Sequence, residues 1–589
     1  MRDMGLRLLL PYMRPYRGRL LLGTLYAFIG ASASAWSPTI LGWAIDELRG
    51  GLDLLALGRY AVGLVLLAGT LALFRYLLRM LTGTIAAGIS YQMSQDFFAR
   101  LLILDRAALL QFGTGDLLSR ATNDFVYIWK FYSAGFQMAI HALFVLLIGC
   151  ILMAQASSLL TALIFGLLAV SIVVQVGFGR LLERAFDSVQ REMAKLAAFS
   201  QEHLHGARTL AAYAQEQPTV SAFAHLNETY AKSNLHFVVR SSAISLLPPF
   251  IVRLAATLVL VIGGALIINS TLTIGQYVQF LAYLGLLNTA MLQIGRSFER
   301  LQQGSAAAGR IGEVLRRVPH VADAPNAIRT SLNGTVRFEG VGVYAEGQWL
   351  LRDITFEAPA GTTLGIVGAT GAGKSTLLSL VGRIRDPDAG QICIDSYDIR
   401  QIKLKKLRRA VTYVPQESLL FSMSVRENIM LGLSSLPEER LQIAVRASRL
   451  SNDLAQLSSG LNTVVGEGGA TLSGGQKQRT ALARALARES QILLLDDALA
   501  SVDTQTAAEI IGELNAMSEK RTCLIVSQRL AAVRNADQII VLNQGRIVER
   551  GTHATLLRRD GIYAAMYYRE LQQAKDEAQH TAHHYQNDD

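Results

Sequence analysis

A glycine-rich segment spanning residues 368–376, with the sequence GATGAGKST, carries residue types suited to holding phosphates. It follows the apolar run Leu364–Val367 and precedes Leu377–Val381, so a strand should end and a helix begin here. The glycines let backbone N–H groups surround a β-phosphate, Lys374 brings charge to the β- and γ-phosphates, and Ser375 offers Mg²⁺ a hydroxyl. The residues expected to contact a nucleotide are Gly368, Ala369, Thr370, Gly371, Ala372, Gly373, Lys374, Ser375 and Thr376.

An acidic pair follows a second apolar run. Ile492–Leu495 predicts a buried strand, and Asp496 stands at its end. A carboxylate in this position can hold Mg²⁺ through water. The sequence therefore predicts that Asp496 lies near the phosphate loop and shares its metal.

Between these elements stands a third motif, LSGGQ, at residues 472–476. In this order the three motifs resemble the ATP-binding cassette, and with the apolar half before it the chain is similar to a half-size ABC exporter over nearly all 589 residues. The resemblance implies an α-helical membrane domain followed by an α/β P-loop cassette that uses ATP and Mg²⁺. Since LSGGQ completes the phosphate site of a second cassette, it also implies a dimer.

The resemblance assigns further residues. Tyr344 is expected to stack on adenine, Gln416 to contact Mg²⁺ and the attacking water, and Asp503 to belong to the loop that crosses between cassettes. The motif residues expected to cap the γ-phosphate bound by the partner are Leu472, Ser473, Gly474, Gly475 and Gln476.

Two positions depart from the family pattern. Hydrolytically competent members have glutamate where this chain has Asp497, and histidine where it has Gln528. Aspartate is one methylene shorter, and misplacing a catalytic group by about 1 Å can cost on the order of a hundredfold in rate. Glutamine donates a hydrogen bond but carries no charge and shuttles no proton. Together the changes indicate slow or absent hydrolysis; the alternative is that both substitute in a working site.

Composition divides the chain. Apolar residues make up 51% and charged residues 17%, with mean hydropathy +0.29, which is too apolar for an ordinary soluble protein. The predicted divisions are a cytoplasmic segment at 1–19, a transmembrane domain at 20–315, a linker at 316–335, a nucleotide-binding domain at 336–571 and a disordered polar tail at 572–589. The net charge of +10 lies beside apolar spans, which favours anionic lipid over nucleic acid as its counterpart.

Six apolar windows are long enough to cross a bilayer. They fall at Leu20–Ile45, Tyr60–Leu81, Ser133–Ala154, Leu159–Gly179, Ala243–Ile268 and Gln276–Phe298. Arginines precede the first window, whereas the short loops at 155–158 and 269–275 contain no Lys or Arg, so the N-terminus and the ATP domain should be cytoplasmic. The expected location is the bacterial plasma membrane.

Charged, helix-compatible segments at 91–132 and 180–240 predict cytoplasmic extensions of the spans. Within them, 112–124 and 206–216 resemble the two intracellular loops through which exporters of this family transmit cassette closure. An amphipathic surface helix with no such role is the simpler interpretation of each.

Arginines inside apolar windows are hypotheses of function, because an Arg near the middle of a membrane helix costs about 2.5–3.5 kcal/mol. Arg79 and Arg296, near cytoplasmic ends, are expected to snorkel, and Arg75 also falls toward that side. Arg253 lies about halfway along its window, which suggests a cavity that favours amphipathic anions.

The predicted function is a subunit of an ATP-driven exporter that moves hydrophobic or amphipathic compounds outward. The partner is expected to be a second half-transporter with glutamate and histidine at the positions of Asp497 and Gln528 and an altered signature motif. Alternatives are a dedicated lipid or peptide exporter, and a nucleotide-binding regulatory subunit without transport of its own.

Overall fold

The computed structural model describes residues 2–50, 54–345, 347–500, 504–518 and 521–573. The chain forms two compact units. The first comprises Met1–Leu102 and Gly113–Arg316, and the second Ile103–Phe112 with Arg317–Asp589. The short segment 103–112 therefore belongs, by its contacts, with the second unit.

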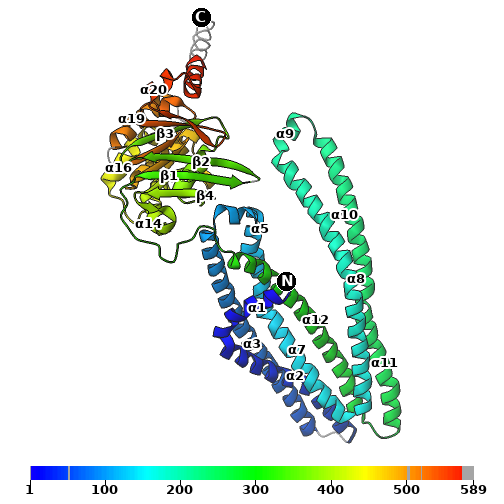
Figure 1. Ribbon diagram of the computed structural model, residues 1–589. Coiled ribbons are helices and arrows are strands. Elements are labelled where there is room, and N and C mark those ends of the chain that lie inside the picture. Colours follow the sequence, from blue (N-terminus) through cyan, green and yellow to red (C-terminus); the bar gives the residue numbers. More distant parts are fainter. Residues whose placement is uncertain (1, 51–53, 346, 501–503, 519–520, 574–589) are drawn as a thin grey trace. The chain divides into compact units, whose positions relative to one another are not determined.

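The first unit is entirely helical (Figure 1). The predicted apolar windows lie in long helices: α2 (Arg17–Gly50), α3 (Leu54–Ile103), α7 (Phe136–Ala156), α8 (Ser158–His205), α11 (Leu247–Ile268) and α12 (Ile274–Arg316). Within the described residues, 5 continuous helical stretches are long and apolar enough to cross a membrane, and Ser158–Val170 is a shorter apolar helix. The expected helical membrane domain is confirmed.

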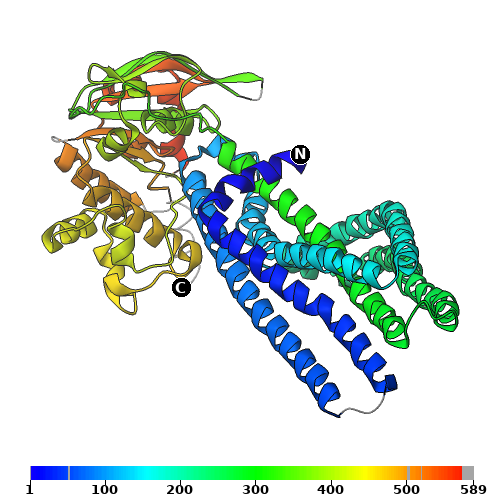
Figure 2. The same cartoon turned by 90° about the horizontal axis from the view of Figure 1, so that it is seen from below.

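The remaining helices of this unit are shorter or more polar. They are α1 (Arg2–Met13), η1 (Arg14–Tyr16), α5 (Thr114–Ser119), η2 (Arg120–Asp124), α6 (Phe125–Lys130), η3 (Phe131–Gly135), α9 (Ala207–Ala212) and α10 (Glu216–Ser245). Helices α8 and α10 run side by side and are joined at α9 (Figures 1 and 2). The second predicted intracellular loop therefore forms a short helix at the end of a long helical pair.

Polar contacts fix α2 against α12. The Tyr283 hydroxyl donates to the Ala35 carbonyl at 2.7 Å and lies 2.9 Å from the Thr39 hydroxyl, to which Gln279 donates at 3.0 Å. In an apolar surrounding such bonds hold neighbouring helices in one register. Near the ends of the same helices, a Cβ on Gly275 would collide with the Gly42 carbonyl, so the two backbones approach too closely for a side chain.

A cluster of charged residues, some of them buried, joins η2 to the last turns of α12. The Arg120 guanidinium donates to Asp116 and Glu313, both at 2.8 Å, and Arg310 donates to Asp124 at 2.9 Å. Arg120 is 8% exposed and Asp124 1% exposed, so these charges depend on one another for compensation. Residues 116–124 are thereby fastened to α12, the helix that ends the first unit.

The second unit contains two sheets. The four-stranded sheet, in the order β2-β1-β4-β5, is antiparallel and consists of β1 (Val336–Ala345), β2 (Gln348–Ala358), β4 (Ala389–Ile394) and β5 (Tyr397–Asp398). The six-stranded sheet, in the order β10-β9-β3-β8-β7-β6, consists of β3 (Thr363–Gly368), β6 (Val411–Val414), β7 (Ile492–Asp496), β8 (Thr522–Val526), β9 (Gln538–Asn543) and β10 (Arg546–Gly551). All but β10 are parallel, which confirms an α/β fold.

Helices complete this unit. They are α4 (Arg106–Leu110), α13 (Lys374–Val381), α14 (Leu404–Ala410), α15 (Val425–Ile429), α16 (Glu438–Ala447), α17 (Ser451–Leu454), α18 (Gly474–Ala487), α19 (Thr504–Ser518) and α20 (His553–Arg558), with one-turn helices η4 (Ile399–Gln401), η5 (Gly460–Asn462), η6 (Glu467–Gly469) and η7 (Leu530–Ala532). Residues of β3, α13, β7 and β8 are largely buried and supply much of the apolar core. This packing fixes the strand ends from which the site is built.

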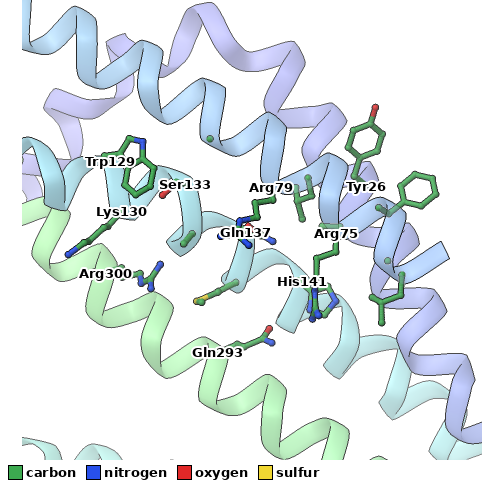
Figure 3. Close-up of a pocket in the computed structure, with 18 residues that line it drawn as sticks. Tyr26, Arg75, Arg79, Trp129, Lys130, Ser133, Gln137, His141, Gln293 and Arg300 are labelled. Atoms are coloured by element: carbon green, nitrogen blue, oxygen red, sulfur yellow. The ribbon is translucent and has the colours of Figure 1, made fainter. Parts of the chain in front are cut away.

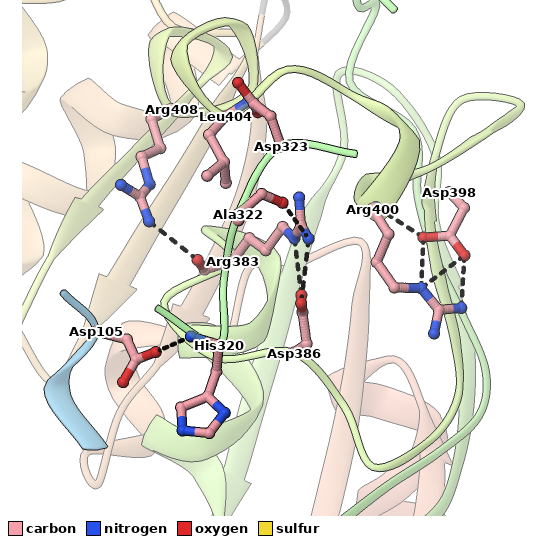
Figure 4. A network of polar contacts seen from close by, with 10 residues as sticks. All are labelled: Asp105, His320, Ala322, Asp323, Arg383, Asp386, Asp398, Arg400, Leu404 and Arg408. Atoms are coloured by element: carbon pink, nitrogen blue, oxygen red, sulfur yellow. Dashed lines mark hydrogen bonds and ion pairs between the residues drawn. The ribbon is translucent and has the colours of Figure 1, made fainter. Parts of the chain in front are cut away.

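The segment after α12 is held by hydrogen bonds (Figure 4). The His320 amide donates to Asp105 at 2.6 Å, and Arg383 donates to the Ala322 carbonyl at 3.1 Å. Asp323 accepts from the Leu404 amide at 2.7 Å. Although burial opposes the effect, the backbone N–H groups of Ala108 and His320 lower the pKa of Asp105. Residues 103–112 and 317–323 are therefore one connected part of the second unit.

Candidate nucleotide-binding site

The phosphate loop lies between β3 and α13 in the middle of the parallel sheet. Every residue of β3 is buried. A Cβ on Gly368 would collide with the Leu542 carbonyl, and one on Gly373 would lie 2.7 Å from Leu351, so both positions require glycine. The Lys374 ammonium donates to the carbonyls of Gly368 at 2.7 Å and Ala369 at 2.9 Å, which holds the lysine along the loop.

A cavity of about 270 Å³ opens in front of this loop. Its lining brings together the residues that the sequence predicts for phosphate, metal and water: Thr370, Gly371, Gly373, Lys374, Ser375, Thr376, Gln416, Asp496, Asp497 and Gln528, with Leu350 and Val526. Burial lowers the pKa of Lys374, whereas Asp497 and Asp496 favour its charged form. The cavity thus combines a cation with a group of oxygen donors.

Asp496 is oriented by two hydroxyl groups. Its Oδ1 accepts from the Ser375 hydroxyl at 2.9 Å and its Oδ2 from the Tyr413 hydroxyl at 2.8 Å. A carboxylate and a hydroxyl at hydrogen-bonding distance, beside the Gln416 amide, are the oxygen ligands that Mg²⁺ prefers. The donor set therefore fits this metal, which Ser375, Gln416 and Asp496 would hold and which would neutralise phosphate charge when bound.

The backbone of Asp497 is held in a defined conformation. Its φ is +47°, in the left-handed region. Its backbone N–H donates to the Val526 carbonyl at 2.9 Å, and the backbone N–H of Gln528 donates to its Oδ1 at 3.4 Å. Burial raises the pKa of Asp497, and the charge of Asp496 adds to this effect. Because the backbone is fixed, only the length of the side chain determines how far its carboxylate reaches.

Other predicted residues lie outside the cavity. Tyr344 is 46% exposed on β1 and packs edge-on against Trp349, with ring centroids 5.4 Å apart. Leu472 is buried, and Ser473 caps α18 by accepting from the Gln476 backbone N–H at 3.3 Å. Gly474, which is exposed, and Gly475, which is partly buried, lie in the first turn. Asp503 lies outside the described residues.

The sequence did not predict that Tyr413 belongs to the nucleotide site. Its position depends on the pairing of β6 with β7, in which Tyr413 lies opposite Leu494, two residues before Asp496. A tyrosine in a short apolar strand is usually interpreted as packing. The signal was its place as the second-last residue of a strand that leads to Gln416.

The fold and the cavity define a P-loop ATPase domain in one chain with a helical membrane domain. Comparison with known proteins agrees: residues 351–500 match the ABC transporter family and residues 20–291 match the ABC transporter transmembrane region. The chain belongs to the ABC transporter family. It is a multi-pass protein of the bacterial inner membrane with its ATP domain in the cytoplasm, as expected.

Several relatives extend along nearly the whole chain. A probable multidrug resistance ABC transporter ATP-binding/permease protein, YheI of Bacillus subtilis, is 32% identical over 90% of this chain and 92% of the relative. An ATP-dependent lipid A-core flippase of Desulfotalea psychrophila is 32% identical over 77% and 80%. The structure of a bacterial Atm1-family ABC exporter with ATP bound superposes with a TM-score of 0.81 at 26% identity, covering 94% of this chain and 98% of the other. The chain is therefore a half-size ABC exporter, and it is similar along most of its length to relatives named for multidrug resistance and for lipid A-core flipping.

Proposed function

We propose that this chain is one half of a heterodimeric exporter, binds ATP in a site of its own that hydrolyses slowly, and lends its LSGGQ motif to the partner's working site. The observation that carries the proposal is the content of the cavity. Its phosphate loop and its oxygen donors for Mg²⁺ are complete, whereas the two groups placed to activate water are Asp497 and Gln528.

The chemistry of the two positions supports slow hydrolysis. Asp497 lies on a fixed backbone, so its carboxylate falls one methylene short of where glutamate would place it. Gln528 offers an uncharged amide. Both changes affect the step in which water attacks and leave Lys374 and Ser375 in place, so ATP affinity is retained while turnover falls.

The signature motif supports a role in the partner's site. Ser473 and the first turn of α18 present backbone N–H groups at the N-terminus of a 14-residue helix. Such a helix end attracts phosphate oxygens. None of the LSGGQ residues described lines this chain's own cavity, which supports the proposal that they meet phosphate bound by a second cassette.

An asymmetric pair of variants tests the proposal in the complex with the co-purified second half-transporter. Lys374→Ala disables this chain's own site and should lower ATP hydrolysis by less than about threefold. Gly475→Asp places a carboxylate where the partner's γ-phosphate should bind and should lower it by about a hundredfold or more. Equal losses from the two variants would show two equivalent sites, and unchanged hydrolysis with Gly475→Asp would remove the role proposed for the motif.

A further inference from the structure

The helical unit contains a second and larger cavity, of about 730 Å³ (Figure 3). It lies among α2, α3, the segment from α6 to α7, and α12. Its volume lies within the range of pockets that take small-molecule ligands. Because all of these elements belong to the first unit, the cavity is a feature of the membrane domain alone.

The charged residues that line the cavity are all basic. Arg75, Arg79, Lys130 and Arg300 line the cavity, and no Asp or Glu does so among the residues described. Within the described residues, none of these four side chains makes an ion pair or a hydrogen bond. The Lys130 ammonium lies 5.7 Å from the Tyr127 ring centroid. A cavity that gathers cations without counter-ions attracts an anion.

The rest of the lining is amphipathic. Tyr26, Phe74 and Trp129 supply aromatic surface, while Ser133, Gln137 and Gln293 supply neutral polar groups. The Nε2 atom of His141, also in the lining, is buried and has no hydrogen-bond partner. Aromatic rings beside cations suit a ligand with an apolar body and a charged head.

Helix geometry separates the cations into two places. Arg75 and Arg79 lie one turn apart on α3, close to His141 and Gln137, whereas Lys130 and Arg300 lie together near Trp129 (Figure 3). Lys130 and His141 are about 16 Å apart along the continuous helical stretch Thr114–Ala156, at ~1.5 Å per residue. An elongated ligand, or a head with more than one anionic oxygen, can meet both groups.

The cavity lies toward the cytoplasmic side. Lys130 precedes the third apolar window and Arg300 follows the sixth, and both of these window ends face the cytoplasm in the orientation set by the loops. The sequence pointed instead to Arg253, which is exposed on α11 and is not among the lining residues. Arg79, expected to snorkel, lines the cavity together with Arg75.

We propose that this cavity binds the anionic head of an amphipathic export substrate, a phosphate or carboxylate carried on an apolar body. The transport part of this proposal rests on the chain acting as one half of an exporter, as proposed above, whereas binding does not. Snorkelling toward lipid headgroups would spread the cations around the outside of the helices. Here cations from three elements, α3, α6 and α12, converge on one cavity instead.

Binding to the complex in phosphatidylcholine nanodiscs without ATP tests the assignment. Three probes with the same alkyl chain are compared: dodecyl phosphate, dodecyl maltoside and dodecyltrimethylammonium. We expect dodecyl phosphate to bind at least about tenfold more tightly than the other two, with an affinity that falls as salt is raised. R75Q/R79Q and R300Q should each weaken dodecyl phosphate about tenfold and leave dodecyl maltoside unchanged.

Two matched variants separate charge from folding. Arg296 lies one turn before Arg300 on α12, is exposed and does not line the cavity, so R296Q should leave binding unchanged. R75K/R79K keeps both charges and should retain most of the affinity that R75Q/R79Q loses. Equal affinity for the three probes, or equal losses in R296Q and R300Q, would overturn the proposal. Because the experiment uses the complex, it also detects pairing of these cations with the partner's carboxylates. Such pairing would abolish the preference for dodecyl phosphate.

Two further measurements identify where the ligand comes from and whether it is transported. If phosphatidylglycerol in the nanodisc displaces dodecyl phosphate, the anion is a membrane lipid; if it does not, the anion is an amphipath that arrives from the cytoplasm. Selective binding without ATP-dependent movement of the probe in proteoliposomes supports the cavity and refutes export. Movement of all three probes at equal rates supports export and refutes the cavity's selectivity.

Discussion

Restoring the two unusual residues of the nucleotide site should convert a slow site into a working one. The Asp497 backbone cannot shift toward ATP, because its N–H donates to the Val526 carbonyl at 2.9 Å and because Asp497 directly follows β7, whose residues are all buried. Reach must therefore come from the side chain. Asp497→Glu adds one C–C bond, about 1.5 Å, which is more than the ~1 Å displacement that costs about a hundredfold in rate.

The expected gain is about a hundredfold in kcat for the double variant D497E/Q528H, with little change in KM for ATP. Lys374 and Ser375 are untouched, so binding of ATP in the ground state is retained. Each single variant should give a smaller gain. Gln528→His supplies a hydrogen-bond donor that can carry a proton, but it does not extend the carboxylate of residue 497 toward the water.

The assay should use the chain alone, driven to form like-with-like dimers and trapped by cross-linking. In such dimers both composite sites combine this chain's phosphate loop with its own intact LSGGQ, so an altered signature motif in another subunit cannot mask the gain. D497E/Q528H/K374A serves as the background control. Cross-linked dimers that bind ATP but hydrolyse it no faster with D497E/Q528H than without would refute the reasoning, as would unmodified dimers already turning over at about 10 per second.

Other predictions concern single contacts. Asp497→Asn should raise the melting temperature of the nucleotide-free protein near pH 8, since burial raises the pKa of Asp497 and its ionised form therefore destabilises the fold; the gain should shrink as pH falls toward the unfolded value of about 3.9, and scanning fluorimetry that shows an equal gain at every pH would contradict this. Tyr413→Phe removes a donor to Asp496 and should raise the Mg²⁺ concentration needed for half-maximal ATP binding several-fold, measured by titration, with ATP binding at saturating Mg²⁺ unchanged. Arg120→Gln should lower stability by about 2 kcal/mol, a figure reduced because both acidic partners of this buried Arg are more than 40% exposed; chemical denaturation that shows no loss would mean that the buried charge contributes little.

The nucleotide site was largely predictable because its parts are short motifs with their own local geometry. The order of glycines, Lys374 and Ser375 requires a strand before it and a helix after it, and the structure has β3 and α13 there. The proximity of Asp496 and Asp497 to Gln528 depends on β7 pairing in parallel with β8, where Asp496 lies opposite Val526. The family resemblance supplied that pairing; composition alone does not.

The membrane cavity was less predictable. The insertion cost of an arginine singles out the residue nearest the middle of a window, which is why Arg253 stood out, but it does not say which face of the helix packs inward. Lys130 and Arg300 lie just outside the apolar windows, so a search of those windows passes over them. Their convergence with Arg75 depends on the packing of helices that are distant in sequence, and Arg300 is more than two hundred residues from Arg75.

The proposed asymmetry has a kinetic consequence that follows from which contacts are intact. ATP affinity depends on the phosphate loop, Lys374 and the metal donors around Asp496, all of which the structure brings into one cavity. Hydrolysis depends on the groups that activate water, and these are the altered ones. ATP in this site would therefore leave mainly by dissociation, and its residence would outlast many turnovers in the partner's site. One interface between the cassettes would stay joined while the other opens and closes, so the membrane domains would never have to separate completely between transport cycles.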